Sequence, residues 1–447
     1  MQTDLAPQWK ATREGNEAEA ILRKCVHCGF CTATCPTYQL LGDELDGPRG
    51  RIYLMKQVLE GTEPTRATQL HLDRCLTCRN CESTCPSGVE YGNLVEIGRR
   101  IVERRVERPA GQRAARWLLK EGLTSPLFGL AVKIGQVVRP LLPAALKHKV
   151  PPKAQPSAYD WPTRSHARKV LLLQGCVQPT LAPNINSATA RVLDAAGLQT
   201  LVADEAGCCG AIRLHLNDHD GGLADMRRNI DAWWPLVSQG AVGAIVMNAS
   251  GCGVTVREYG HALAHDPAYA DKARRISELT KDLSELLPEI VPKLRERLAH
   301  QRSESGHGEG AADSAARATE RLAFHPPCTL QHGQKLRGGV EAGLRELGFE
   351  VRVAITDSHL CCGSAGTYSV LQPELAYRLR NRKLESLAPL EPHVIVSANI
   401  GCIQHLQSGT ATPVKHWIEA VDDALACSKR SSIRPRWHLR AEPAASR

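Results

Sequence analysis

Two copies of one cysteine motif, 50 residues apart, constrain this chain more than any other feature. The first copy reads Cys25-x-x-Cys28-x-x-Cys31-x-x-x-Cys35-Pro36, and the second runs from Cys75 through Cys78 and Cys81 to Cys85-Pro86. This spacing is typical of bacterial ferredoxins with two [4Fe–4S] clusters, in which the fourth cysteine of each motif binds the other cluster. The motifs therefore predict two ligand sets: Cys25, Cys28, Cys31 and Cys85 for one cluster, and Cys75, Cys78, Cys81 and Cys35 for the second.

Zinc knuckles are the alternative for the same cysteines. Zinc sites usually join two Cys-x-x-Cys pairs and lack both the third evenly spaced cysteine and the Cys-Pro ending. A disulfide framework also fits poorly, because the chain has 17 cysteines, an odd number, and no apolar N-terminal segment typical of a secretory signal. We therefore favour iron–sulfur clusters in a reducing compartment, and we expect no membrane span because no apolar run reaches the required length.

Eight further cysteines form a second duplication. Cys176, Cys208, Cys209 and Cys252 recur as Cys328, Cys361, Cys362 and Cys402, at offsets between 150 and 153 residues. Short apolar runs such as Lys169–Leu173 and Arg321–His325 precede these cysteines and alternate with helix-length stretches such as Asn184–Ala196 and Pro373–Leu387. This pattern predicts two α/β units with largely parallel strands, and it places each cysteine after the carboxyl end of a strand.

The vicinal cysteines of this second set leave three interpretations open. A vicinal disulfide is strained and would act as a reducible switch. Four converging cysteines would instead bind a metal or an additional cluster, and burial as ordinary small apolar residues is the third interpretation. The seventeenth cysteine, Cys427, stands outside every motif.

These patterns predict a multidomain α+β protein. We expect a helical domain with two [4Fe–4S] clusters at residues 1–97, and two duplicated α/β cysteine-rich repeats at 167–299 and 321–427. We further expect residues 98–166 to form a basic connecting segment, 300–320 a disordered insertion and 428–447 a flexible tail. Helices over Arg49–Glu60 and Glu90–Val106 should bracket the clusters. For Arg49 and Arg51 we expect solvation rather than contact with a cluster, because solvent exposure is the commoner state of arginine.

The positive charge is concentrated in one segment. The net charge is +9, whereas residues 98–153 alone hold 13 Lys or Arg against 3 Asp or Glu. Nucleic-acid binding is disfavoured because only Trp117 and Phe128 supply aromatic rings there. We interpret the segment as a docking surface for an anionic membrane or an acidic partner, with a solvated helical linker as the alternative.

The order of these motifs resembles that of the iron–sulfur subunits of membrane-associated 2-hydroxyacid and glycerol-phosphate dehydrogenases, and of glycolate oxidase (glycolate dehydrogenase) in particular. Segments that carry the resemblance include KCVHCGFCTATCPTY, LDRCLTCRNCESTCPSGVEYG, EAGCCGAIRLHL, HPPCTLQHGQKLR and DSHLCCGSAGTYS. The resemblance implies an electron-transfer subunit in a hetero-oligomer with FAD-containing dehydrogenase subunits. It further implies a membrane quinone or similar acceptor, and a cytoplasmic location at the inner face of the cell membrane. Related lactate or glycerol-3-phosphate dehydrogenases and a heterodisulfide-reductase-like thiol enzyme are the alternatives.

One departure separates the chain from heterodisulfide reductase, whose repeats end in Cys-x-x-Cys. Ala249 and Asn399 stand three residues before Cys252 and Cys402, so each repeat has four cysteines rather than five.

The chain has neither a G-x-G-x-x-G motif nor a P-loop, so we expect FAD on the partner subunits and no organic-substrate site here. Of the chain's 17 histidines, six are scattered outside any motif, and we expect core or surface roles rather than metal ligation for them: His27, His215, His219, His261, His325 and His332. His325 and His405 lie close to repeat cysteines and are the first histidines to test.

Overall fold

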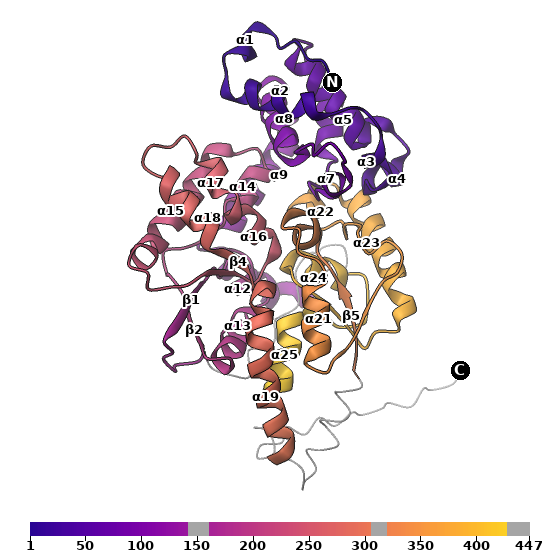
Figure 1. Ribbon diagram of the computed structural model, residues 1–447. Helices are drawn as coiled ribbons and strands as arrows, with labels where there is room; N and C mark the ends of the chain where they lie inside the picture. The colour runs from indigo at the N-terminus through magenta and orange to yellow at the C-terminus, as the bar shows by residue number, and fades with distance from the viewer. Residues whose placement is uncertain (142–160, 305–319, 427–447) are drawn as a thin grey trace, which may run out of the picture.

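The computed structural model describes residues 1–141, 161–304 and 320–426. Figure 1 shows a helical part (indigo to purple) above two α/β units that lie side by side. This arrangement confirms the expected fold class, a helical cluster domain followed by two α/β repeats. The predicted tail at 428–447, Cys427 and most of the predicted insertion lie outside the described residues.

The helical part packs its longest helices around one core. Its elements are α1 (Pro7–Lys10), α2 (Arg13–Lys24), α3 (Phe30–Ala33), α4 (Pro36–Leu41), η1 (Glu44–Asp46), α5 (Pro48–Leu59), α6 (Arg66–Asp73), α7 (Asn80–Thr84) and α8 (Tyr91–Arg105). Leu22, Met55 and Leu94 from α2, α5 and α8 are buried in the same apolar cluster. A Cβ on Gly98 would lie 2.4 Å from Met55 Sδ, so this glycine allows α8 to approach α5 closely.

Each α/β unit contains a four-stranded parallel sheet. The strands are β1 (Arg168–Leu172), β2 (Leu198–Leu201), β3 (Ile245–Met247) and β4 (Thr280–Asp282) in the first unit, and β5 (Arg321–His325), β6 (Glu350–Val353), β7 (Val394–Ser397) and β8 (Val414–His416) in the second. The orders β2-β1-β3-β4 and β6-β5-β7-β8 are identical, so the sequence duplication is a structural one. The sequence patterns did not predict β4 and β8, which are only three residues long.

Helices cover the sheets and join the two units. The first unit has α12 (Gln178–Leu181), α13 (Asn184–Ala195), α14 (Ala211–His215), α15 (His219–Ser238), α16 (Ser250–Arg257), α17 (Tyr259–Ala262), α18 (Ala270–Leu279), η3 (Leu283–Leu286) and α19 (Leu287–Glu304). The second has η4 (Thr329–Gly333), α21 (Gly339–Glu346), α22 (Tyr368–Leu371), α23 (Pro373–Leu387), η5 (Ala388–Leu390), α24 (Ile400–Gln407) and α25 (Trp417–Ala426). Arg191 of α13 pairs with Asp422 of α25 at 2.6 Å, and one apolar core runs through both units.

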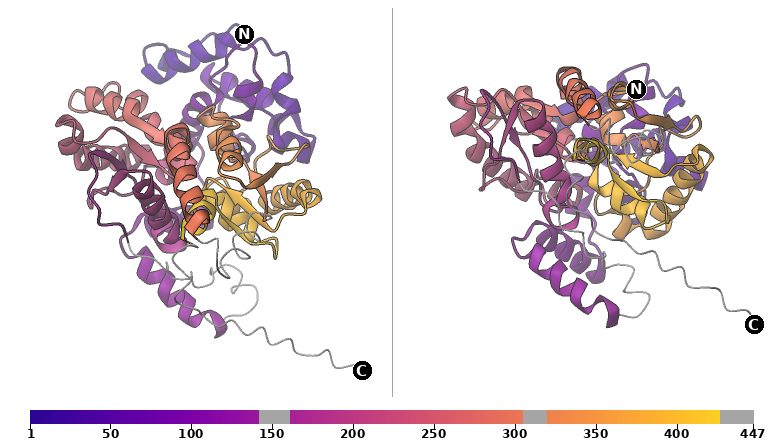
Figure 2. Two further views of the ribbon diagram at one scale, coloured as in Figure 1. Left: turned by 60° about the horizontal axis from the view of Figure 1, so that its bottom comes forward. Right: turned by 90° about the horizontal axis from the view of Figure 1, so that it is seen from below.

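The connecting segment is helical where it is described. It contains α9 (Ala110–Thr124), α10 (Phe128–Val138) and η2 (Arg139–Leu141). In Figure 2, α10 (purple) lies at the edge of the molecule, apart from the two sheets. Within residues 1–141, 161–304 and 320–426, no helix has the length and apolar character needed to cross a membrane. The helix α19 extends to Glu304, five residues into the segment that the sequence assigned to the insertion.

Candidate iron–sulfur and cysteine-rich site

The two ferredoxin motifs form two copies of the same loop. Cys25 follows α2, and the residues at positions 27 and 29, His27 and Gly29, have positive φ angles of 55° and 85°. In the second copy Cys75 follows α6, and Thr77 and Arg79 have φ angles of 53° and 60° at the corresponding positions. These left-handed residues turn the chain tightly between successive cysteines.

Cysteines from both motifs surround two small cavities. Cys25, Cys28, Cys31 and Cys85 line the first, and Cys35, Cys75, Cys78 and Cys81 line the second. Each cavity therefore combines three cysteines of one motif with the fourth cysteine of the other. Cys81 borders both cavities, so the two lie next to each other. All eight cysteines are free of disulfides, and thiolate sulfur is the donor that iron–sulfur clusters require, so the residues present fit the expected cofactors.

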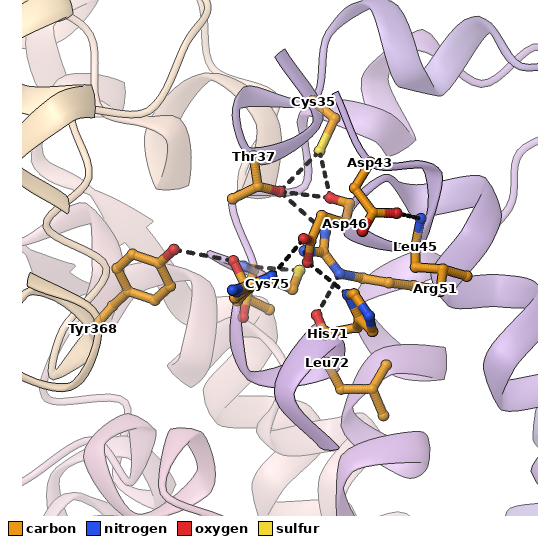
Figure 3. Close-up of polar contacts among 12 residues, drawn as sticks. Cys35, Thr37, Asp43, Leu45, Asp46, Arg51, His71, Leu72, Cys75 and Tyr368 are labelled. Atoms are coloured by element: carbon orange, nitrogen blue, oxygen red, sulfur yellow. Dashed lines mark hydrogen bonds and ion pairs between the residues drawn. The ribbon is translucent and has the colours of Figure 1, made fainter. Parts of the chain in front are cut away.

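A buried ion-pair network supports the second cavity (Figure 3). Arg51 is 1% exposed and donates to the His71 carbonyl at 2.7 Å, to Thr37 Oγ1 at 3.2 Å and to Asp46 at 3.4 Å. Asp46 is fully buried and also pairs with Arg74 at 2.8 Å. The expectation that Arg51 is solvated is therefore wrong: the guanidinium is enclosed because Asp46 and a backbone carbonyl supply partners inside the core.

The network also acts on the thiols. Burial raises the pKa of Cys75, but Arg51 and Arg99 outweigh it and hold that pKa below its ordinary value. Burial raises the pKa of Cys31, in the other cavity, to about 11. Arg49 is only partly solvated: its side chain is 38% exposed and pairs with Glu44 at 2.6 Å, but it also lines the first cavity beside Cys31.

The cysteines of the two repeats stand at the carboxyl ends of their strands, as predicted. Cys176 and Cys328 follow β1 and β5, the vicinal pairs follow β2 and β6, and Cys252 and Cys402 lie in α16 and α24. All eight line one cavity of about 2100 Å³, together with Cys78 of the helical part: Cys176, Cys208, Cys209, Cys252, Cys328, Cys361, Cys362 and Cys402. The structure thus brings both repeats and the second ferredoxin loop to one space.

Hydrogen bonds couple the thiols of the first repeat. Bonds with Cys176 and Cys209 lower the pKa of Cys208. The bond with Cys208, followed by burial, raises the pKa of Cys176. The bonds with Cys208 and Cys252, followed by burial, raise the pKa of Cys209. In the second repeat, Cys328 Sγ lies 3.8 Å from Cys361 Sγ. No disulfide joins any of the described cysteines.

The second ferredoxin loop contacts the second repeat directly. Asn80 donates to the His359 carbonyl at 3.3 Å, and Tyr368 Oη donates to the Arg74 carbonyl at 3.1 Å. Cys78 packs against the apolar cluster that contains Cys328 and Cys361. The cavity of the second ligand set therefore adjoins the cysteines of the second repeat.

Asn399 occupies the place of the missing fifth cysteine and has a different role. Its Oδ1 accepts from the Gly251 amide at 3.2 Å, and its Nδ2 donates to Cys402 Sγ at 3.7 Å. It therefore links the N-terminal end of α24 to the first turn of α16 in the other repeat. In the sequence this position is marked only by the lack of a cysteine, which does not reveal the role of Asn399.

The burial of Arg51 has a signal in the sequence, because Arg51 continues the helical apolar stripe of Met55, Val58 and Leu59.

Histidines near the site have separate environments. His325 is buried close to Cys362 and Cys402. His405 lies in α24 and lines the large cavity, with Nε2 at 3.1 Å from the Ala376 carbonyl oxygen. His332 bridges to the helical part through Ser83 Oγ at 3.0 Å.

In residues 98–141 of the connecting segment, which the structure describes, most cations pair with carboxylates of the same molecule. Arg108 pairs with Asp73 and Glu103, Arg116 pairs with Asp73, and Lys120 pairs with Asp218. The interpretation of the segment as a basic docking surface is therefore wrong for its first part, up to Lys120, because carboxylates of the same molecule pair with these cations. Apolar side chains are exposed instead: Trp117, Leu118, Leu127, Leu130, Ile134, Val137 and Leu141.

Comparison with known proteins agrees with this geometry. Residues 21–89 match the model of a 4Fe-4S dicluster domain, and residues 170–257 and 322–407 match that of a cysteine-rich domain. The chain is 54% identical to the glycolate oxidase iron-sulfur subunit of Escherichia coli, over 95% of this chain and 99% of that protein. It is 29% identical to a probable glycolate oxidase iron-sulfur subunit of Bacillus subtilis, over 88% and 89% of the two chains. A lactate utilization protein A from Exiguobacterium is 22% identical over 57% of this chain. The dicluster match confirms the prediction of two [4Fe–4S] clusters.

Proposed function

Because the chain belongs to the family of glycolate oxidase iron–sulfur subunits, we propose that it is the electron-transfer subunit of a flavin-dependent glycolate dehydrogenase. In this proposal FAD-containing partner subunits oxidise glycolate to glyoxylate, and the electrons leave through this chain. The observation that carries the proposal is the pair of adjacent four-cysteine cavities, one of which adjoins the cysteine-lined space between the repeats.

The proposed cluster ligands are Cys25, Cys28, Cys31 and Cys85 for one cluster, and Cys35, Cys75, Cys78 and Cys81 for the other. When bound, a [4Fe–4S] cluster takes up and releases one electron at a time, which divides the two-electron chemistry of a flavin. The protein's contribution is to hold the thiolates at fixed positions and to exclude water. Arg51 and Arg99 add positive charge beside Cys75, which favours the thiolate.

A substrate panel tests the proposal. The native complex is purified anaerobically, its flavin subunits are identified by mass, and glycolate, lactate or glycerol 3-phosphate is added. We expect glycolate to bleach the visible absorbance of the clusters, and the other two substrates to act far more slowly. Rapid bleaching by lactate or glycerol 3-phosphate instead would assign the chain to a related dehydrogenase. Purification without any flavoprotein would contradict the proposal.

We also propose that the complex associates with the inner face of the cell membrane through α10. Leu127, Leu130, Ile134, Val137 and Leu141 follow the helical spacing i, i+3, i+7, i+10, i+14, and each is at least 57% exposed. In the sequence, residues 122–159 contain five Lys or Arg and no Asp or Glu. An exposed apolar stripe within an acid-free basic segment suits the interface of an anionic lipid bilayer, near a quinone acceptor.

Charged substitutions on this stripe test the membrane proposal. Replacing Leu130 and Ile134 with Glu should weaken binding to phosphatidylglycerol-containing vesicles by at least about tenfold, because burial of one large aliphatic side chain contributes roughly 1.5–3 kcal/mol. The matched control is Val370→Glu, which changes an apolar residue of the second repeat that is 60% exposed. Unchanged vesicle binding combined with loss of the flavin subunits would show that α10 contacts a protein partner instead.

A further inference from the structure

Three metal-binding side chains converge inside the second repeat. His325 is the last residue of β5, Cys362 is the second residue of the vicinal pair, and Cys402 lies in the first turn of α24. A ring nitrogen of His325 and the two Sγ atoms all lie within 4.8 Å of one another. All three residues are buried. Among the residues that the structure describes, no other group of three such close donors includes a cysteine.

His325 has no hydrogen-bond partner for either ring nitrogen, although it is only 1% exposed. Buried polar groups almost always have a partner, so an imidazole without one needs an explanation. His405 of the same repeat shows the ordinary state, with Nε2 in contact with the Ala376 carbonyl. A neutral imidazole has a nitrogen lone pair that can bind a metal ion.

The spacing of the donors suits one ion rather than a cubane cluster. With metal–sulfur distances of about 2.3 Å and metal–nitrogen distances of about 2.0–2.1 Å, tetrahedral ligands lie roughly 3.5–3.8 Å apart. Donors within 4.8 Å of one another reach that spacing with small side-chain movements. The thiolates of a cubane bind four different irons and are farther apart.

The duplication supplies an internal comparison. Cys209 and Cys252 of the first repeat correspond to Cys362 and Cys402, but the residue at the position of His325 is Leu173. The first repeat therefore has the two thiols without the imidazole. An ordinary packing role would be met equally well by leucine at both positions, as it is directly after β1.

The surroundings of the three donors suit a metal ion. Asn399 Nδ2 donates to Cys402 Sγ at 3.7 Å, which orients the thiol from outside the donor set. Cys362 and Cys402 line the large cavity, whereas His325 lies behind them. An ion held by all three would have its fourth coordination position on the cavity side, as in zinc sites that keep an exchangeable ligand.

We propose that His325, Cys362 and Cys402 bind a single divalent ion of the zinc type, with the fourth coordination position open to the cavity. Two thiolates neutralise the charge of such an ion, and mixed imidazole and thiolate donors are those that zinc prefers. The site is separate from both ferredoxin ligand sets and does not depend on the identity of the substrate.

Metal counting on the anaerobically purified holoprotein tests this site. The protein is equilibrated with Zn²⁺ by dialysis, and zinc, iron and sulfide are measured per chain. We expect about one zinc ion per wild-type chain. His325→Leu should weaken zinc binding more than about a hundredfold, since loss of a residue that merely orients a ligand already costs about 10- to 100-fold. In the wild type, Co²⁺ should give the visible thiolate bands of a tetrahedral site in the difference spectrum.

Two cysteine variants provide the matched comparison. Cys402→Ser changes one atom of the proposed site and should lose the zinc, whereas Cys252→Ser makes the same change in the first repeat and should retain it. Unchanged iron content reports that each variant is folded. The proposal is overturned if zinc is absent from the wild type, or if the two serine variants lose it equally. It is also overturned if extra iron and sulfide, rather than zinc, occupy the second repeat.

Discussion

Replacing Cys78 with serine should abolish electron delivery to the acceptor while glycolate still reduces the flavin at its normal rate. Cys78 belongs to the proposed second ligand set and packs against the cluster that contains Cys328 and Cys361. Loss of this thiolate removes a ligand at the point where the helical part meets the repeats. Stopped-flow absorbance separates the two outcomes, because flavin bleaching and reduction of a quinone analogue are recorded in the same complex.

Two further variants make the result specific. Cys28→Ser should behave like Cys78→Ser, because Cys28 lines the other cavity and the two sites act in series. Cys427→Ser should leave both rates unchanged, because Cys427 belongs to none of the cysteine motifs. Full acceptor reduction by the Cys28 or the Cys78 variant would contradict the electron-transfer role.

The Asp46→Asn substitution should lower the free energy of unfolding of the protein by about 3–5 kcal/mol, the usual cost of removing one partner of a buried ion pair. Asp46 is fully buried between Arg51 and Arg74, and the substitution removes its charge while it keeps the shape of the side chain. Arg51, 1% exposed, would then be left as a buried cation without its carboxylate. Urea unfolding of the anaerobic protein, followed through the cluster absorbance, measures the difference.

Asp43→Asn is the control for this substitution. Asp43 is exposed and accepts from the Leu45 amide at 2.9 Å as the first residue of the same turn. Asparagine fills that role as well as aspartate, so the effect should stay below about 1 kcal/mol. Equal unfolding midpoints for the two variants would show that the buried network does not stabilise the helical part.

The elements that local patterns specify could be predicted from the sequence. The predicted helix at Pro373–Leu387 is observed with the same bounds, and the strand predicted at Lys169–Leu173 is shifted by one residue. The short strand β4 could not be predicted in this way, because three residues carry no periodicity and the strand forms only by pairing with β3.

The environment of individual side chains depended on contacts between distant segments. The sequence predicts Arg51 in solvent, but Asp46 and the carbonyl of His71 from neighbouring elements enclose it. The eight repeat cysteines could be placed at strand ends, yet their convergence with Cys78 on one cavity requires the packing of three parts of the chain. His325 was notable in the sequence only for its proximity to Cys328, and the lack of partners at both its nitrogens is visible only in three dimensions.

Iron and acid-labile sulfide analysis of the anaerobically purified chain tests the central claim most directly. Two [4Fe–4S] clusters require about eight irons and eight sulfides per chain. That content should fall in variants of any of the eight ferredoxin cysteines and should remain unchanged in Cys252→Ser. A content of about sixteen irons per chain, or a colourless protein that holds zinc at the ferredoxin cysteines, would contradict the account.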